Sequence, residues 1–145
     1  MSGRPGRPTE PDDLRRDRRA IHKPADLGTE LRAARASATD PRQAIADVAA
    51  AYMAFAEQRS ALYDAMFTHT VDLPFASTGT PAALREAFAE LCEPLRPHAG
   101  DDDLETFAET FWSGLHGLLT LMRNGRLRHE EHERRLELLV GRFSR

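Results

Sequence analysis

The fold is decided by residues 103–123, DLETFAETFWSGLHGLLTLMR. Asp102 and Glu105 have the spacing of a capping box that begins a helix, and Asn124-Gly125 is typical of a helix end. Apolar side chains lie on nearly every side of this predicted helix: Leu104, Phe107, Phe111, Trp112, Leu115, Leu118, Leu119, Leu121 and Met122. A helix that is apolar all round belongs at the centre of a bundle or between two subunits.

Two glycines in this helix and a second apolar stripe point to a dimer. Glycine within a helix costs about 1 kcal/mol relative to alanine, and it usually permits a close approach of another backbone. The last predicted helix, about 129–143, carries its apolar residues on one face. We therefore predict a four-helix dimer interface that contains Gly114, Gly117, Leu118, Leu121, His132, Leu136, Leu139, Val140 and Phe143.

The rest of the chain is also predicted to be helical. Asp40-Pro41 is typical of a helix start, and apolar residues from Ile45 to Ala56 then recur at helical spacing. A short helix is expected after Ser60, a loop over 72–79, and another helix that Thr80 caps. Because no strand alternation or internal repeat is visible, we predict an all-α helical bundle.

Composition bounds the class of protein. The 145 residues suit one domain, and no apolar run is long enough to cross a membrane. The single cysteine, Cys92, cannot form an intrachain disulfide, so a reducing cytoplasm is the expected location and no membrane partner is expected. Residues 1–23 carry seven basic and four acidic side chains, whereas the remainder is acidic. We predict a basic leader over 1–25, disordered or weakly helical, and a folded domain over 26–145.

Residues 40–143 resemble the C-terminal ligand-binding and dimerisation domain of tetracycline-repressor-like transcriptional regulators. The resemblance rests on three runs: Tyr52-Met53-Ala54-Phe55-Ala56, Leu62-Tyr63-Asp64-Ala65-Met66-Phe67 and Trp112-Ser113-Gly114-Leu115-His116-Gly117-Leu118. The third run resembles the subgroup named for a Trp-His-Gly signature. The resemblance implies a homodimer whose regulatory domain responds to a small effector.

The sequence departs from this family at its start. Family members begin with about 50 residues that form a three-helix DNA-binding unit, a size at the small end of independent domains. Here His22-Lys23-Pro24-Ala25-Asp26-Leu27 resembles the segment that follows that unit, and too few residues precede it. A natural deletion, a misassigned start and an engineered chain all fit. We expect DNA binding at an operator only where another chain or upstream sequence supplies the helix-turn-helix.

An effector pocket is predicted between the helices at 41–58, 80–93 and 103–123, with Trp112 and His116 on its wall. Pockets in helical bundles are apolar with few polar groups, and histidine supplies the polar contact. The alternative is that these residues are ordinary core, with His116 satisfied by a carbonyl or a tyrosine. The candidate ligand-binding residues are Tyr52, Phe55, Tyr63, Met66, Phe67, Phe88, Cys92, Phe111, Trp112 and His116.

Other chemistry finds less support in the sequence. His129 and His132 suggest a metal, but zinc sites commonly need three or four protein ligands, so no metal and no cofactor is predicted. The run Arg4-Pro5-Gly6-Arg7-Pro8 resembles an AT-hook core, which leaves weak DNA binding through the leader as an alternative function. A dimerisation module without an effector, or an inactivating partner of a full-length repressor, is the other alternative. No nucleophile elbow or phosphate loop is present, so no enzymatic activity is predicted.

Overall fold

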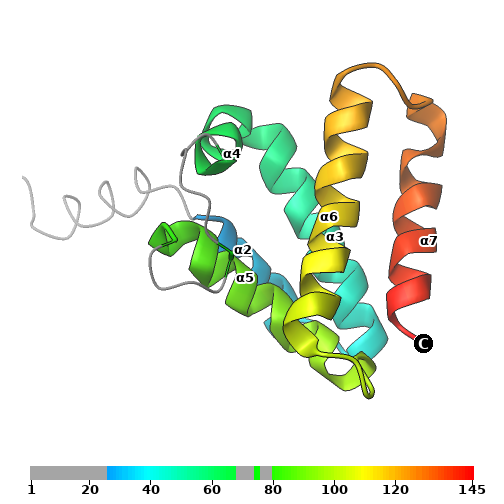
Figure 1. The fold of residues 1–145 in the computed structure, drawn as a ribbon. Helices are drawn as coiled ribbons and strands as arrows, with labels where there is room; N and C mark the ends of the chain where they lie inside the picture. The colour runs from blue at the N-terminus through cyan, green and yellow to red at the C-terminus, as the bar shows by residue number, and fades with distance from the viewer. Residues whose placement is uncertain (1–25, 68–73, 76–79) are drawn as a thin grey trace, which may run out of the picture.

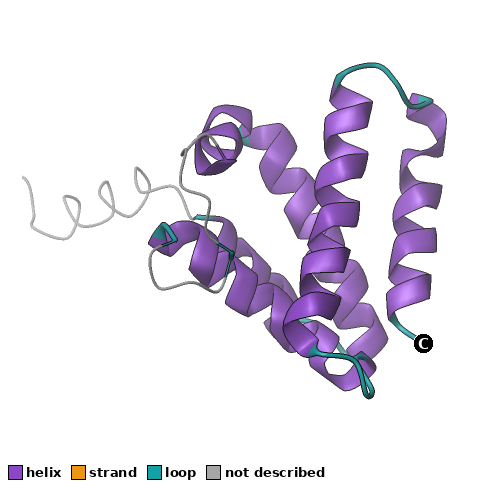
Figure 2. Ribbon diagram, in the orientation of Figure 1, coloured by secondary structure: helices purple, strands orange, loops and turns teal. Residues whose placement is uncertain are grey.

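The structure is a computed structural model, and it describes residues 26–67, 74–75 and 80–145. All regular secondary structure within these residues is helical, as Figure 2 shows. The elements are α2 (Leu27–Ala36), α3 (Pro41–Gln58), α4 (Ser60–Phe67), α5 (Ala82–Leu95), η1 (Arg96–His98), α6 (Leu104–Arg123), η2 (His129–Glu131) and α7 (His132–Phe143). The all-α prediction is therefore confirmed for this part of the chain. The predicted leader, 1–25, lies outside the described residues.

The central helix of the bundle is α3. It contacts α2, α4, α5, α6 and α7, which surround it (Figure 1). Alanines at several of its buried positions let neighbouring helices approach closely: Ala44, Ala49 and Ala56 are buried beside Ile45 and Val48. Since α3 takes the centre, α6 lies to one side and packs on α3, α5 and α7. Leu121 of α6 is 45% exposed, so part of the apolar surface of α6 is not buried within the chain.

The helix starts follow the sequence signals with two corrections. Asp40 caps α3 as predicted, because its carboxylate accepts a hydrogen bond from the Gln43 backbone N–H. The cap of α6 is Asp103 rather than Asp102: its carboxylate accepts from both the backbone N–H and the hydroxyl of Thr106. Thr80 does not cap α5. Its hydroxyl donates instead to the carbonyl of Pro74, and the N-cap position falls on Pro81.

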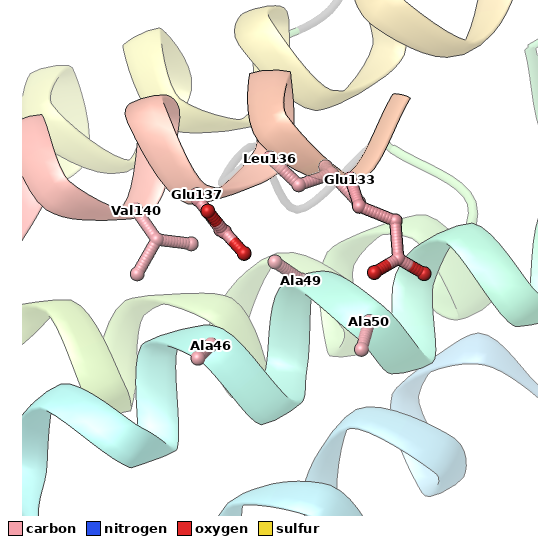
Figure 3. Close-up of a pocket in the computed structure, with 7 residues that line it drawn as sticks. All are labelled: Ala46, Ala49, Ala50, Glu133, Leu136, Glu137 and Val140. Carbon is pink, nitrogen blue, oxygen red and sulfur yellow. The ribbon is translucent and has the colours of Figure 1, made fainter. Parts of the chain in front are cut away.

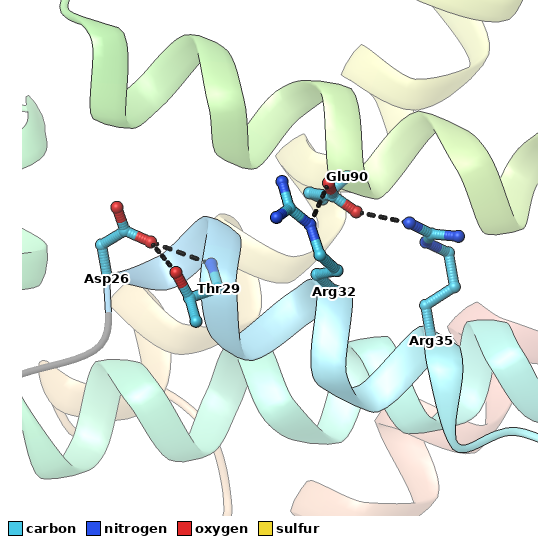
Figure 4. A network of polar contacts seen from close by, with 5 residues as sticks. All are labelled: Asp26, Thr29, Arg32, Arg35 and Glu90. Carbon is cyan, nitrogen blue, oxygen red and sulfur yellow. Dashed lines mark hydrogen bonds and ion pairs between the residues drawn. The ribbon is translucent and has the colours of Figure 1, made fainter.

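Helices α2 and α5 are joined by an ion-pair cluster, shown in Figure 4. Glu90 of α5 is almost fully buried and accepts a hydrogen bond from Arg32 Nε at 2.8 Å and another from Arg35 Nη2 at 2.8 Å. Both arginines come from α2, one turn apart. A carboxylate at this depth needs charged partners, and the two guanidinium groups supply them.

Helices α6 and α7 run in opposite directions along one side of the bundle (Figure 1). The turn between them begins at Asn124-Gly125, where Gly125 adopts a φ of +69° and the Arg126 N–H bonds back to Leu121 O. Only glycine adopts this backbone conformation without strain. The predicted helix end is therefore confirmed. Among the described residues, no helix is both long and apolar enough to cross a membrane.

Candidate functional site

Seven ring side chains form an aromatic cluster where α3, α4, α5 and α6 meet. Its members are Tyr52, Tyr63, Phe67, Phe75, Phe88, Trp112 and His116. The Tyr52 ring meets Tyr63 and Trp112 edge to face, with centroid distances of 5.6 and 5.9 Å. These are favourable geometries for aromatic pairs. The cluster thus joins rings from four helices and from Phe75, which precedes α5, into one contiguous and largely buried group.

A chain of hydrogen bonds runs through the cluster from α3 to α6. The Tyr52 and Tyr63 hydroxyls are in hydrogen-bonding contact, and the Tyr63 hydroxyl lies 2.6 Å from His116 Nδ1. With neutral His116 accepting at Nδ1, Tyr63 donates to the imidazole and Tyr52 donates to Tyr63. Every hydroxyl proton then has an acceptor in an otherwise apolar region, as buried polar groups require.

Trp112 stacks on a residue that the sequence analysis did not select. Phe75 lies face to face with the indole at 4.4 Å and with the Phe88 ring at 5.3 Å. The signal for Phe75 was available, since Leu73-Pro74-Phe75 is an apolar run inside the predicted loop. The buried indole N–H of Trp112 makes no hydrogen bond of normal geometry within the described part of the chain, but it interacts with the Tyr52 hydroxyl and opposes the rise in the pKa of Tyr52. The cluster therefore contains a buried donor without a well-formed hydrogen bond.

Arg123 is a second residue that the sequence analysis missed. Its guanidinium lies over the Tyr63 ring at 5.4 Å, binds Asp64 Oδ1 at 2.9 Å, and donates to the carbonyl of Ala56. One side chain from the end of α6 thereby holds α3 and α4 in place beside the cluster. Nothing in the local sequence around Arg123 distinguishes it from the other arginines, because its partners are distant in sequence.

The protonation of the cluster follows from its burial. Burial raises the pKa of Tyr63 to about 12, and it raises the pKa of Tyr52 further, with the Tyr63 hydroxyl adding to the increase. Burial also lowers the pKa of His116, and the positive charge of Arg123 lowers it again. Both tyrosines and the histidine are therefore neutral at pH 7, which matches the donor order given above.

The predicted pocket residues do not all meet at one place. Six of them belong to the aromatic cluster: Tyr52, Tyr63, Phe67, Phe88, Trp112 and His116. Phe111 instead contacts Phe143 of α7 at 5.1 Å, and Met66 lines a small groove of about 190 Å³ between α4 and α5.

Phe55 is buried in the core, and Cys92 is a buried thiol whose pKa is raised to about 11 by its burial. An effector cavity on Trp112 and His116 stays a prediction.

Several predicted interface residues already have partners within the chain. Leu139 packs against the open side of Gly114, and Phe143 contacts Phe107 at 4.9 Å. Val140 is buried, and Leu136 is half-buried against the core. By contrast Gly117 has nothing within 4 Å of its missing side chain, and Leu121 is exposed. Leu138, which was not selected, is 57% exposed on α7.

The sequence also suggested a metal site at His129 and His132 and DNA contact through the leader. Within the described residues, no three side chains of the His, Cys, Asp or Glu type are grouped so that they could hold a metal ion. His129 lies in η2 and His132 begins α7. The Arg4–Pro8 run lies outside the described residues, so its DNA contact stays a prediction.

Comparison with known proteins gives one match. The model of the tetracyclin repressor-like, C-terminal domain family matches residues 45–143, which include α4, α5, α6 and α7 and nearly all of α3. Comparisons with curated proteins and with solved structures gave no significant match.

Proposed function

The chain belongs to the tetracyclin repressor-like C-terminal domain family, and from that premise we propose that it is a dimeric regulatory domain that binds a small, largely apolar effector. The family implies a regulatory role. The finer statements, on the effector and on the dimer, rest on separate features of the chain. No catalytic activity is part of the proposal.

The aromatic cluster carries the effector proposal. Ligand sites in helical bundles combine apolar and aromatic walls with a few polar groups that fix orientation. Here the walls are rings from four helices and from Phe75, and the polar groups are the Tyr63 hydroxyl, His116 and the indole N–H of Trp112, which has no well-formed hydrogen bond. A buried donor without an acceptor costs about 1–3 kcal/mol. An apolar effector that carries one oxygen acceptor recovers that energy on binding.

The exposed face of α6 and α7 carries the dimer proposal. Leu121 and Leu138 are large apolar side chains exposed on these helices, and Gly117 offers a surface that a second backbone can approach. Stable homodimer interfaces are large and strongly apolar. We infer that two copies pair through this outer face, while the stripe of Leu139, Val140 and Phe143 serves the protomer's own packing.

Tryptophan fluorescence tests the effector proposal directly, because Trp112 is the only tryptophan in the chain. The probes are 2-naphthol, which carries an oxygen, and naphthalene, which does not. We expect saturable quenching of Trp112 with 2-naphthol bound more tightly, and a raised melting temperature through ligand linkage. The His116→Ala variant should bind 2-naphthol about tenfold more weakly, a change of roughly 1.4 kcal/mol.

A matched variant separates a pocket from ordinary core. Phe143→Leu alters an aromatic residue of the α6–α7 contact, outside the cluster, and should leave probe binding unchanged. Absence of quenching and of any thermal shift in the wild-type chain, together with a destabilised His116→Ala variant, would identify the cluster as filled core and refute the proposal.

A further inference from the structure

A second potential ligand site lies between α3 and α7, away from the aromatic cluster. The groove between these helices has a volume of about 290 Å³, and no member of the aromatic cluster lines it. Figure 3 shows its lining, which comes from both helices. The residues are Ala46, Ala49 and Ala50 of α3 and Glu133, Leu136, Glu137 and Val140 of α7.

The α3 side of the groove consists of alanines. Their short side chains leave the space between the helices unfilled, and the apolar part of the α7 lining consists of Leu136 and Val140. Ala49 is buried and belongs to the hydrophobic core, so the core holds this side of α3 in position. Apolar surface that remains open to water favours an apolar occupant.

The α7 side adds two carboxylates to this apolar surface. Glu133 and Glu137 are four residues apart, so they lie on one face of α7, and Figure 3 shows both carboxylates directed from α7 toward α3. In the part of the chain that is described, neither has an ion-pair partner. Like charges at this spacing on a helix repel each other. A cation placed between them would remove that repulsion.

We infer that this groove binds a small organic cation with an apolar body, the cationic group between Glu133 and Glu137 and the apolar body on the alanines of α3. The carboxylates and the apolar surface together select the ligand. An inorganic cation would leave the alanines exposed to water, and a neutral hydrocarbon would leave the two carboxylates without a cationic partner. The volume is at the lower end of the range of about 300–1,000 Å³ for small-molecule sites, which favours a compact ligand.

The test compares two probes that differ only in charge, 4-phenylbutylammonium and 4-phenyl-1-butanol. Each is titrated into the full chain while amide chemical shifts are followed by NMR. We expect the ammonium to bind at least about tenfold more tightly than the alcohol, with shifts centred on α3 and α7, and its affinity to fall as salt is raised. Shifts centred on Trp112 and His116 would place the probe in the aromatic cluster and overturn the inference.

Variants isolate the two parts of the site. Glu133→Gln with Glu137→Gln removes the charge and should reduce the affinity for the ammonium to that for the alcohol. Glu105→Gln with Glu109→Gln changes a carboxylate pair of the same spacing on α6 and should have no effect. Ala46→Leu fills the groove and should weaken both probes.

Equal binding of the two probes, unchanged ammonium affinity in Glu133→Gln/Glu137→Gln, or no binding at millimolar probe would each refute the inference. Sedimentation of the same samples identifies a second copy as the occupant: a change from dimer to monomer in Glu133→Gln/Glu137→Gln, with no probe binding, would also overturn it.

Discussion

A side chain at position 114 would collide with Leu139, since a Cβ built on Gly114 lies 2.9 Å from the Leu139 Cδ1 methyl. Gly117, one turn further along α6, has nothing within 4 Å of the same position. Two glycines of one helix thus have different roles. Gly114 lets α7 pack closely on α6 within the chain, and Gly117 leaves an opening on the surface.

The two alanine variants at these positions should behave differently. Gly117→Ala gains helix propensity and should raise the free energy of unfolding by about 0.5–1 kcal/mol. Gly114→Ala gains the same propensity, but its methyl group forces the Leu139 side chain to move, so it should be less stable than Gly117→Ala. Urea denaturation of both variants measures the difference. Equal stabilisation by the two would contradict the packing described for α6 and α7.

The dimer face is tested by charging its exposed leucines. Leu121→Asp combined with Leu138→Asp should convert the dimer into a folded monomer, because both side chains are already in contact with water in the protomer. Leu62→Asp is the control, since Leu62 is 41% exposed on α4, away from this face. Sedimentation velocity reports the mass and circular dichroism reports the helix content. A double variant that still sediments as a dimer would exclude this face.

Glu90 should account for part of the loss of stability in acid. Its burial opposes ionisation, but the hydrogen bonds from Arg35 and Arg32 prevail and hold its pKa below the ordinary value of 4.5. An acid whose pKa is lowered by folding contributes stability above its unfolded pKa and loses it as pH falls through the folded pKa. Glu90→Gln should therefore be less stable at pH 7, by about 1–2 kcal/mol, and should lose less stability below pH 4.5 than the wild type.

The control for Glu90 is Glu93→Gln. Glu93 near the end of α5 pairs with Arg96 at the start of η1, and both side chains are exposed. Exposed ion pairs of this kind contribute little to stability. Denaturation curves from pH 3 to pH 7 compare the variants, and identical acid profiles for Glu90→Gln and the wild type would disprove the assignment.

His116 should make the domain less stable in mild acid. Its pKa is lowered by burial and by Arg123, so the unfolded chain binds a proton at higher pH than the folded chain does. Stability should then be full above the unfolded value of about 6.5 and should fall as pH drops from there to the folded pKa. Protonation also reverses the hydrogen-bond chain, because Nδ1 becomes a donor and the Tyr52 hydroxyl proton loses its acceptor.

The matched variant is His116→Asn, whose amide oxygen can still accept from Tyr63 but does not titrate. Its stability between pH 5 and pH 7 should lack the decline that His116 produces. The histidine resonance in NMR gives the folded pKa directly. A folded pKa at or above 6.5 would contradict the burial argument.

The helices could be predicted from the sequence because their signals are local. Asp40-Pro41 and Asn124-Gly125 act through bonds to their own neighbours, so the ends they mark were found. The start of α6 was displaced by one residue because three aspartates in a row offer equivalent caps, and only the fold selects Asp103. The prediction that Thr80 caps α5 was wrong for a related reason, because its hydroxyl donates to the carbonyl of Pro74 instead.

The site could be predicted only in part. Tyr52, Trp112 and His116 were selected because helical spacing places them on inward faces. Phe75 was missed because it lies in a predicted loop, where buried residues are not expected. Arg123 was missed because its contacts join segments that are distant in sequence. The apolar stripe of α7 was ambiguous from the sequence alone, because an interface and an intrachain contact require the same residues. Leu139 contacts Gly114 within the chain, and the part that this stripe takes in a dimer interface stays a prediction.

The attachment of α2 to α5 has a mechanical consequence. Arg32 and Arg35 bind one carboxylate from points about 4.5 Å apart along the helix axis. A shift or rotation of α2 therefore either breaks one of these contacts or moves α5 with it. Phe88, two residues before Glu90 on α5, stacks on Phe75 and faces Trp112. Rotation of the first described helix would turn the wall of the aromatic cluster with it.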